Sequence, residues 1–97
     1  MTVTRDSIVQ ELAGLRDELA RRYTVRRIGV FGSVARNEAA ESSDIDLLVE
    51  LEQPTFDHYM DLKFSLEAHF GREVDLVLMD TLKPRLKPLI ERDVVYA

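Results

Sequence analysis

Residues 25–51 read VRRIGVFGSVARNEAAESSDIDLLVEL, and this stretch decides the fold. The β-forming residues of Val25–Phe31 predict a strand that ends abruptly at Gly32-Ser33. Residues 34–43 are small, polar and charged, which indicates a short helical turn and a loop. Apolar residues then alternate along Asp44–Leu51, so we expect a second strand there with one face toward the core.

A helix precedes the first strand. It is predicted over Thr4–Tyr23 by apolar residues that recur every three or four positions: Ile8, Leu12, Leu15 and Leu19. Two cap arrangements are open at its start, a capping box of Ser7 with Gln10 or a cap by Thr4 one turn earlier.

A second long helix and a third strand follow the second strand. Thr55 is the expected N-cap of a helix that runs to Phe70, and Gly71 is placed to stop it. The apolar stripe of this helix consists of Phe56, Tyr59, Met60, Leu62, Leu66 and Phe70. The apolar residues of Val74–Met79 then predict a strand.

The last residues complete the predicted architecture. Pro84 and Pro88 interrupt the chain, a short helix is expected over Leu89–Arg92, and Val94-Val95-Tyr96 is expected to pack on the core. This element order predicts a single domain over residues 1–97 of the α/β (α+β) class. We expect a small mixed sheet of about three to four strands with helices packed on one face.

Composition excludes several classes of protein. Of the 97 residues, 45% are hydrophobic, yet every apolar run is far shorter than the ~20 residues that span a bilayer. The absence of cysteine and of a recognisable signal peptide favours a cytoplasmic location. The net charge is −5, and residues 36–61 contain one basic residue and eight acidic ones. We therefore expect no membrane partner and no direct nucleic-acid partner.

A candidate metal site lies at the start of the second strand. Asp44 and Asp46 are two residues apart, so both carboxylates point to the same face of the strand. Asp75, near the start of the next strand, is brought beside Asp46 if those strands pair. Carboxylate oxygens select Mg²⁺ or Mn²⁺, and three of them can hold two ions ~3.5–4 Å apart.

A candidate phosphate site lies at the end of the first strand. Gly32 allows a phosphate to approach the backbone, and Ser33 adds a hydroxyl donor. Arg36 follows about one helical turn later and is a further candidate phosphate contact. Phosphate donors beside metal ligands are what a nucleoside triphosphate with its magnesium requires.

Each feature has a simpler reading when it stands alone. A Gly-Ser pair is commonly a turn, and an Asp-x-Asp pair is commonly a solvated strand edge. His58 and His69 have no partner at metal-ligand spacing and are read as packing or solvated residues. The cluster Lys83, Arg85 and Lys87 is read as solvated, with attraction of a triphosphate as the weaker option.

The combined pattern resembles a known family. Phe31-Gly32-Ser33-Val34-Ala35-Arg36, followed by Ser43-Asp44-Ile45-Asp46-Leu47-Leu48-Val49, is similar to the minimal nucleotidyltransferases of the DNA polymerase β-like superfamily, which include the antitoxins of HEPN/MNT pairs. The resemblance extends from the leading helix to the apolar end of the chain. Family members often have glycine after the arginine, whereas this chain has Asn37, a residue that tolerates positive φ.

The resemblance implies a function and a role for each site residue. The expected activity is transfer of AMP from ATP to a tyrosine hydroxyl of a cognate HEPN ribonuclease toxin, which silences that toxin. Gly32 and Ser33 would hold the triphosphate, and Asp44 and Asp46 would bind two Mg²⁺ ions. Asp75 would ligate the catalytic ion and assist deprotonation of the acceptor. The alternatives are an antitoxin that only binds its toxin, and a nucleotidyltransferase that modifies a small molecule such as an aminoglycoside.

Overall fold

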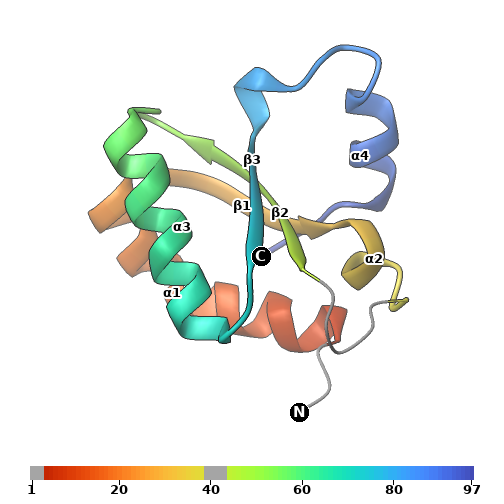
Figure 1. The fold of residues 1–97 in the computed structure, drawn as a ribbon, viewed down its shortest axis with the longest axis horizontal. Coiled ribbons are helices and arrows are strands. Elements are labelled where there is room, and N and C mark those ends of the chain that lie inside the picture. Colours follow the sequence, from red (N-terminus) through yellow and green to blue (C-terminus); the bar gives the residue numbers. More distant parts are fainter. Residues whose placement is uncertain (1–3, 39–43) are drawn as a thin grey trace.

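The structure is a computed structural model, and it describes residues 4–38 and 44–97 (Figure 1). Two long helices and a sheet of four strands form its body. In chain order the elements are α1 (Arg5–Tyr23), β1 (Val25–Phe31), α2 (Gly32–Ala35), β2 (Ile45–Leu51), α3 (Phe56–Phe70), β3 (Val74–Leu78), the 3₁₀ turn η1 (Met79–Thr81), α4 (Lys87–Asp93) and β4 (Val95–Tyr96). No helix within the described residues has both the length and the apolar character needed to cross a membrane.

The sheet is mixed, as predicted. Its strand order is β3-β2-β1-β4, with β1 antiparallel to both neighbours and β2 parallel to β3. The register places Asp46 opposite Phe31 on one side and opposite Asp75 on the other. The sheet therefore aligns the starts of β2 and β3 with the end of β1.

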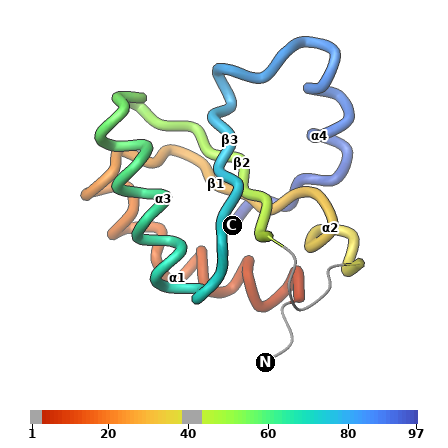
Figure 2. Tube along the Cα trace, in the orientation of Figure 1, coloured from red at the N-terminus to blue at the C-terminus, as the bar shows by residue number. Residues whose placement is uncertain are grey.

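One face of the sheet carries the hydrophobic core. Helices α1 and α3 lie side by side on this face (Figures 1 and 2). The best-buried core side chains come from these helices and from alternate strand positions: Leu12, Leu19, Ile28, Val30, Ile45, Leu47, Val49, Leu62 and Leu66. Because strand side chains alternate, Phe31, Gly29, Asp46, Leu48 and Asp75 belong to the opposite face, which we call the site face.

Local side-chain chemistry sets the ends of the long helices. Thr4 caps α1, its hydroxyl accepting from the Ser7 amide at 3.1 Å while the Ser7 hydroxyl accepts from the Thr4 amide at 3.2 Å. This confirms the cap by Thr4, and the box of Ser7 with Gln10 is wrong because Ser7 already lies inside the helix. Thr55 caps α3, and Gly71 ends it in the left-handed conformation, as predicted.

The remaining predictions differ from the structure mainly near the end of the chain. Met79 leaves the third strand for the 3₁₀ turn, and α4 begins at Lys87, before the predicted Leu89. The apolar end forms a fourth strand, β4, which pairs with β1. Phe56 is 75% exposed, so it does not belong to the buried stripe of its helix. The loop predicted over the later part of residues 34–43 lies partly outside the described residues.

Candidate active site

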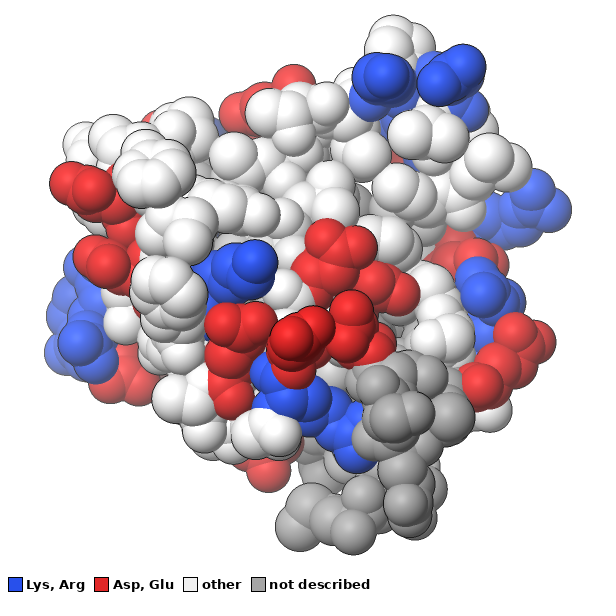
Figure 3. All heavy atoms as spheres, viewed as in Figure 1, with Lys and Arg blue, Asp and Glu red and all other residues white. Residues whose placement is uncertain are grey.

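The sheet brings two of the three predicted carboxylates together. Asp46 and Asp75 are direct partners in the parallel ladder, so their side chains leave the same face of neighbouring strands. Asp44 precedes the first residue of β2 and is exposed, so the ladder does not fix its position. Acidic side chains gather over the starts of β2 and β3 in the space-filling view (Figure 3).

The crowding of these carboxylates changes the chemistry of Asp46. Burial raises the pKa of Asp46 above its ordinary value, and the negative charges of Asp75 and Asp44 raise it further. A side-chain hydrogen bond with Asp75 acts in the same direction, and the positive charge of Arg36 opposes it. The fold thus keeps like charges close together at a cost in electrostatic free energy. Such an arrangement is typical of a functional site that binds a cation.

The donor set fits magnesium, although the side chains do not form a complete shell. Hard carboxylate oxygens aligned on two strands are suitable Mg²⁺ ligands. Within residues 4–38 and 44–97, no three acidic or histidine side chains lie close enough to share one ion. The three-carboxylate metal site therefore stays a prediction.

The predicted phosphate corner touches the carboxylate pair. Gly32 has φ +72°, a left-handed conformation that glycine adopts without strain. A Cβ atom at this position would collide with the Oδ2 atom of Asp46 and lie 3.0 Å from its Cγ atom. Ser33 follows in the first turn of α2, where backbone N–H groups have no partner within the helix. The predicted phosphate corner at Gly32 and the candidate metal ligand Asp46 are thus immediate neighbours.

The guanidinium of Arg36 is engaged by two carboxylates in this structure. Its Nη1 atom donates to Asp93 at 2.9 Å, and its Nε atom donates to Glu38 at 3.1 Å. Hydrogen bonds to Glu38 and then to Asp93 raise the pKa of Arg36. The guanidinium thus links α2 to α4, and its role as a phosphate contact stays a prediction. Sequence reasoning missed Asp93, because a partner 57 residues away leaves no local pattern.

Asn37 and the two histidines behave as the sequence indicates. Asn37 adopts φ +57°, and its side-chain oxygen accepts from the backbone of Arg5 at 3.2 Å. His58 bonds the carbonyl of Gln53 at 2.8 Å, and His69 joins α3 to α1 by bonding Glu11 at 2.7 Å. Both histidines therefore have structural partners.

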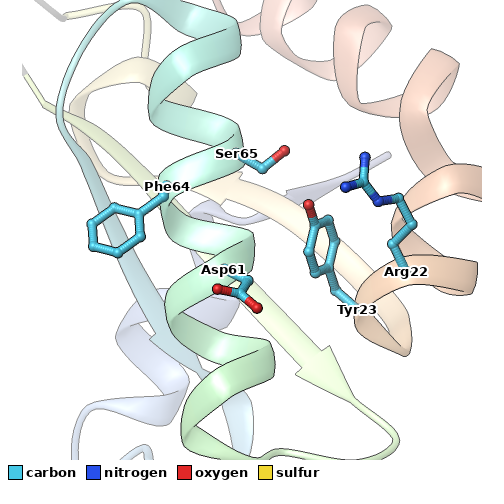
Figure 4. Close-up of a pocket in the computed structure, with 5 residues that line it drawn as sticks. All are labelled: Arg22, Tyr23, Asp61, Phe64 and Ser65. Atoms are coloured by element: carbon cyan, nitrogen blue, oxygen red, sulfur yellow. The ribbon is translucent and has the colours of Figure 1, made fainter.

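A separate cleft of about 440 Å³ lies between the end of α1 and α3 (Figure 4). It is lined by Arg22, Tyr23, Asp61, Phe64 and Ser65, none of which is a predicted site residue. The guanidinium of Arg22 lies 5.4 Å from the centre of the Tyr23 ring and 3.4 Å from Glu18, so it already has partners. Because this cleft is on the helical side of the sheet, it is not the candidate active site.

Comparison with known proteins agrees with this geometry. Residues 12–97 match the family described as Nucleotidyltransferase domain. The chain is 42% identical over 95 residues to protein adenylyltransferase MntA of Thermococcus cleftensis, an alignment that covers 97% of this chain and 96% of that protein. A solved structure assigned to the minimal nucleotidyltransferases is 38% identical, with a TM-score of 0.73 and coverage of 90% of this chain and 93% of that one.

Toxin–antitoxin structures share the fold at lower identity. A toxin–antitoxin structure with AMP-PNP has a TM-score of 0.71 at 21% identity and covers 86% of this chain and 69% of that one. The structure of a tri-AMPylated Shewanella oneidensis HEPN toxin in complex with an MNT antitoxin has a TM-score of 0.64 at 20% identity. It covers 90% of this chain and 69% of the matched one. At this identity the likeness concerns the fold alone.

The chain belongs to the nucleotidyltransferase domain family, whose model matches residues 12–97, and its fold agrees with that assignment. Within that family it is a minimal nucleotidyltransferase of the MntA type, as the sequence predicted.

Proposed function

We propose that this chain transfers AMP from MgATP to a tyrosine hydroxyl of a cognate HEPN toxin and so acts as its antitoxin. The observation that carries the proposal is the ladder pairing of Asp46 with Asp75 directly against Gly32. The name of the Thermococcus relative, protein adenylyltransferase, supports a protein as the acceptor. The complexes of the fold neighbours support a HEPN toxin as that protein. ATP as substrate and a ribonuclease as partner indicate action in the cytoplasm.

Each candidate site residue has a separate role in the proposed reaction. Gly32 and Ser33, which begin α2 at the end of β1, would hold the triphosphate. Asp44, Asp46 and Asp75 would hold Mg²⁺, two ions by family resemblance, which neutralise the charge of the phosphates. The tyrosine oxygen then bonds to the α-phosphorus as the bond to the β-phosphate oxygen breaks, and pyrophosphate leaves. Asp75, the more exposed carboxylate of the pair, would take the phenol proton.

The test is label transfer. The chain, the HEPN toxin encoded beside it and α-labelled ATP are incubated with Mg²⁺, and the labelled residue is identified by mass spectrometry. We expect one or more AMP units on a toxin tyrosine, with Asp46→Asn and Asp75→Asn inactive. Asp61→Asn, on α3 outside the site, is the control and should keep full activity.

The same variants separate the alternatives. Full transfer by Asp46→Asn and Asp75→Asn would overturn the catalytic assignment. Rescue of cells from the toxin by the inactive variants would instead show neutralisation by binding alone. Labelling of an aminoglycoside and not of the toxin would show a small-molecule acceptor.

A further inference from the structure

The last helix is unusual because none of its residues is buried. Helix α4 is seven residues long and has no buried side chain. Two leucines in and beside it, Leu86 and Leu89, are 39% and 52% exposed. Helices this short are not stable on their own and normally depend on burial of an apolar face. In this structure Ile90 of α4 is partly buried, whereas Leu89 and the preceding Leu86 are left facing solvent.

The same segment carries three unpaired cations. Lys83, Arg85 and Lys87 are exposed, and none forms an ion pair with a carboxylate in the described part of the chain. These three cations lie within residues 83–87 of a chain whose net charge is −5. Basic side chains gather in the space-filling view at the upper right, above α4 (Figure 3). We call these three cations together with Leu86 and Leu89 the α4 rim.

The fold attaches the α4 rim to the candidate active site. Asp93, in the last turn of α4, is held by Arg36, which follows the Gly-Ser corner in α2. Directly after α4, the Val94 side chain lies where a Cβ atom of Gly29 would be, on the site face of the sheet. The C-terminal end of α4 therefore lies against the site face, and the α4 rim is on the N-terminal side of the same short helix.

We propose that the α4 rim is the docking surface for the acceptor protein, which would present an apolar strip flanked by carboxylates. The inference rests on the proposed function and specifies how its partner is bound. Leu86 and Leu89 would supply the apolar centre of the contact, and the three cations its polar edge. Charge complementarity would steer the encounter, and docking would bury the leucines that this chain leaves exposed.

A protein fits the α4 rim better than a nucleic acid does. Three cations are few for a phosphate backbone, and the segment has no aromatic side chain on which a base could stack. The other exposed apolar pair, Phe56 and Phe64, lies on α3, the helix that covers the opposite face of the sheet. An acceptor bound there would be separated from Asp46 by the sheet.

The experiment is an equilibrium titration of the cognate HEPN toxin against variants of the chain, without ATP. Leu89→Asp is compared with Phe64→Asp, an equivalent change on α3. The triple reversal of Lys83, Arg85 and Lys87 to Glu is compared with the same reversal of Arg16, Arg21 and Arg26. We expect both rim variants to weaken binding about tenfold or more and both controls to bind as the unmodified chain does. The rim charge reversal should also reduce the dependence of binding on salt.

Each outcome decides the proposal independently of catalysis. A thermal shift caused by MgATP shows that the nucleotide site is intact in each variant. Unchanged binding by both rim variants, or loss of binding in Phe64→Asp instead, would overturn the docking surface. Absence of binding by the unmodified chain would overturn it as well, whereas absence of label transfer with binding retained would count against the proposed function only. Binding of a single-stranded RNA that the rim reversal abolishes, with toxin binding unchanged, would identify a nucleic-acid surface.

Discussion

Replacing Asp46 by asparagine should stabilise the fold while it abolishes transfer. Asp46 and Asp75 are ladder partners on strands about 5 Å apart, and the two charges repel by about 3 kcal/mol at an effective dielectric constant of 20. Asp46 is only partly buried, so solvent screening reduces this repulsion toward the value in water, about 1 kcal/mol. For a domain of this size, that change raises Tm by about 4–8 °C.

The stabilisation by Asp46→Asn should depend on pH in a characteristic way. The pKa of Asp46 is raised in the fold, so the folded state is favoured when this carboxyl is protonated. That stability is fully present below the unfolded-state pKa and is lost as the pH rises through the folded-state value. Asparagine does not titrate, so the gain of Asp46→Asn should be present at pH 7 and absent at about pH 3, below the ordinary value for aspartate.

The assay is thermal unfolding by circular dichroism in EDTA across this pH range. Asp61→Asn removes an exposed charge from α3 and is the control, because its Tm should change little at any pH. A Tm for Asp46→Asn that equals that of the unmodified chain at pH 7 would refute the reasoning. An equal gain at pH 3 and pH 7 would also refute it, because the stabilisation would then not come from charge.

Three further perturbations follow from the geometry. Mg²⁺ should raise the Tm of the unmodified chain at pH 7 and have little effect on Asp46→Asn; equal shifts in both would place the ion elsewhere. Gly32→Ala should destabilise by at least about 1–2 kcal/mol, the cost of a side chain in the left-handed region, because its Cβ atom also meets Asp46. In denaturant unfolding Gly71→Ala, with φ +66° and open space around it, should show the conformational cost alone. Asp93→Ala should speed amide hydrogen exchange in residues 87–93, whereas Glu38→Gln, which leaves the Asp93 contact, should not; equal rates in both variants would show that the ion pair does not hold α4.

The parts of the fold that the sequence predicts are those with a local cause. Caps such as Thr55 and Gly71, and the apolar period of α1, act within one or two turns, so they are visible in the chain itself. The end of the chain was predicted less well because its structure depends on distant residues. Val95–Tyr96 becomes a strand by pairing with β1 at Gly29, where the missing side chain makes room for Val94 and Tyr96.

The site shows the same division. Asp44, Asp46, Gly32 and Ser33 are candidates predicted from spacing, and the parallel pairing of β2 with β3 places Asp75 beside Asp46. The partners of Arg36 do not follow from spacing, because Asp93 reaches α2 only once α4 has folded back.

The hydrogen bond between Arg36 and Asp93 connects the region of the candidate active site with α4. The positive charge of Arg36 acts to lower the pKa of Asp46 through the electric field alone. The same side chain donates a hydrogen bond to Asp93 of α4. A triphosphate at the Gly-Ser corner that is contacted by Arg36 would compete with Asp93 for this guanidinium, because phosphate oxygens accept hydrogen bonds from it as a carboxylate does. On the prediction that Arg36 contacts the triphosphate, nucleotide binding and the position of α4 would be coupled through this one side chain. By reciprocity, a partner that holds α4 would then change the affinity for the nucleotide by the same factor as the nucleotide changes the affinity for the partner.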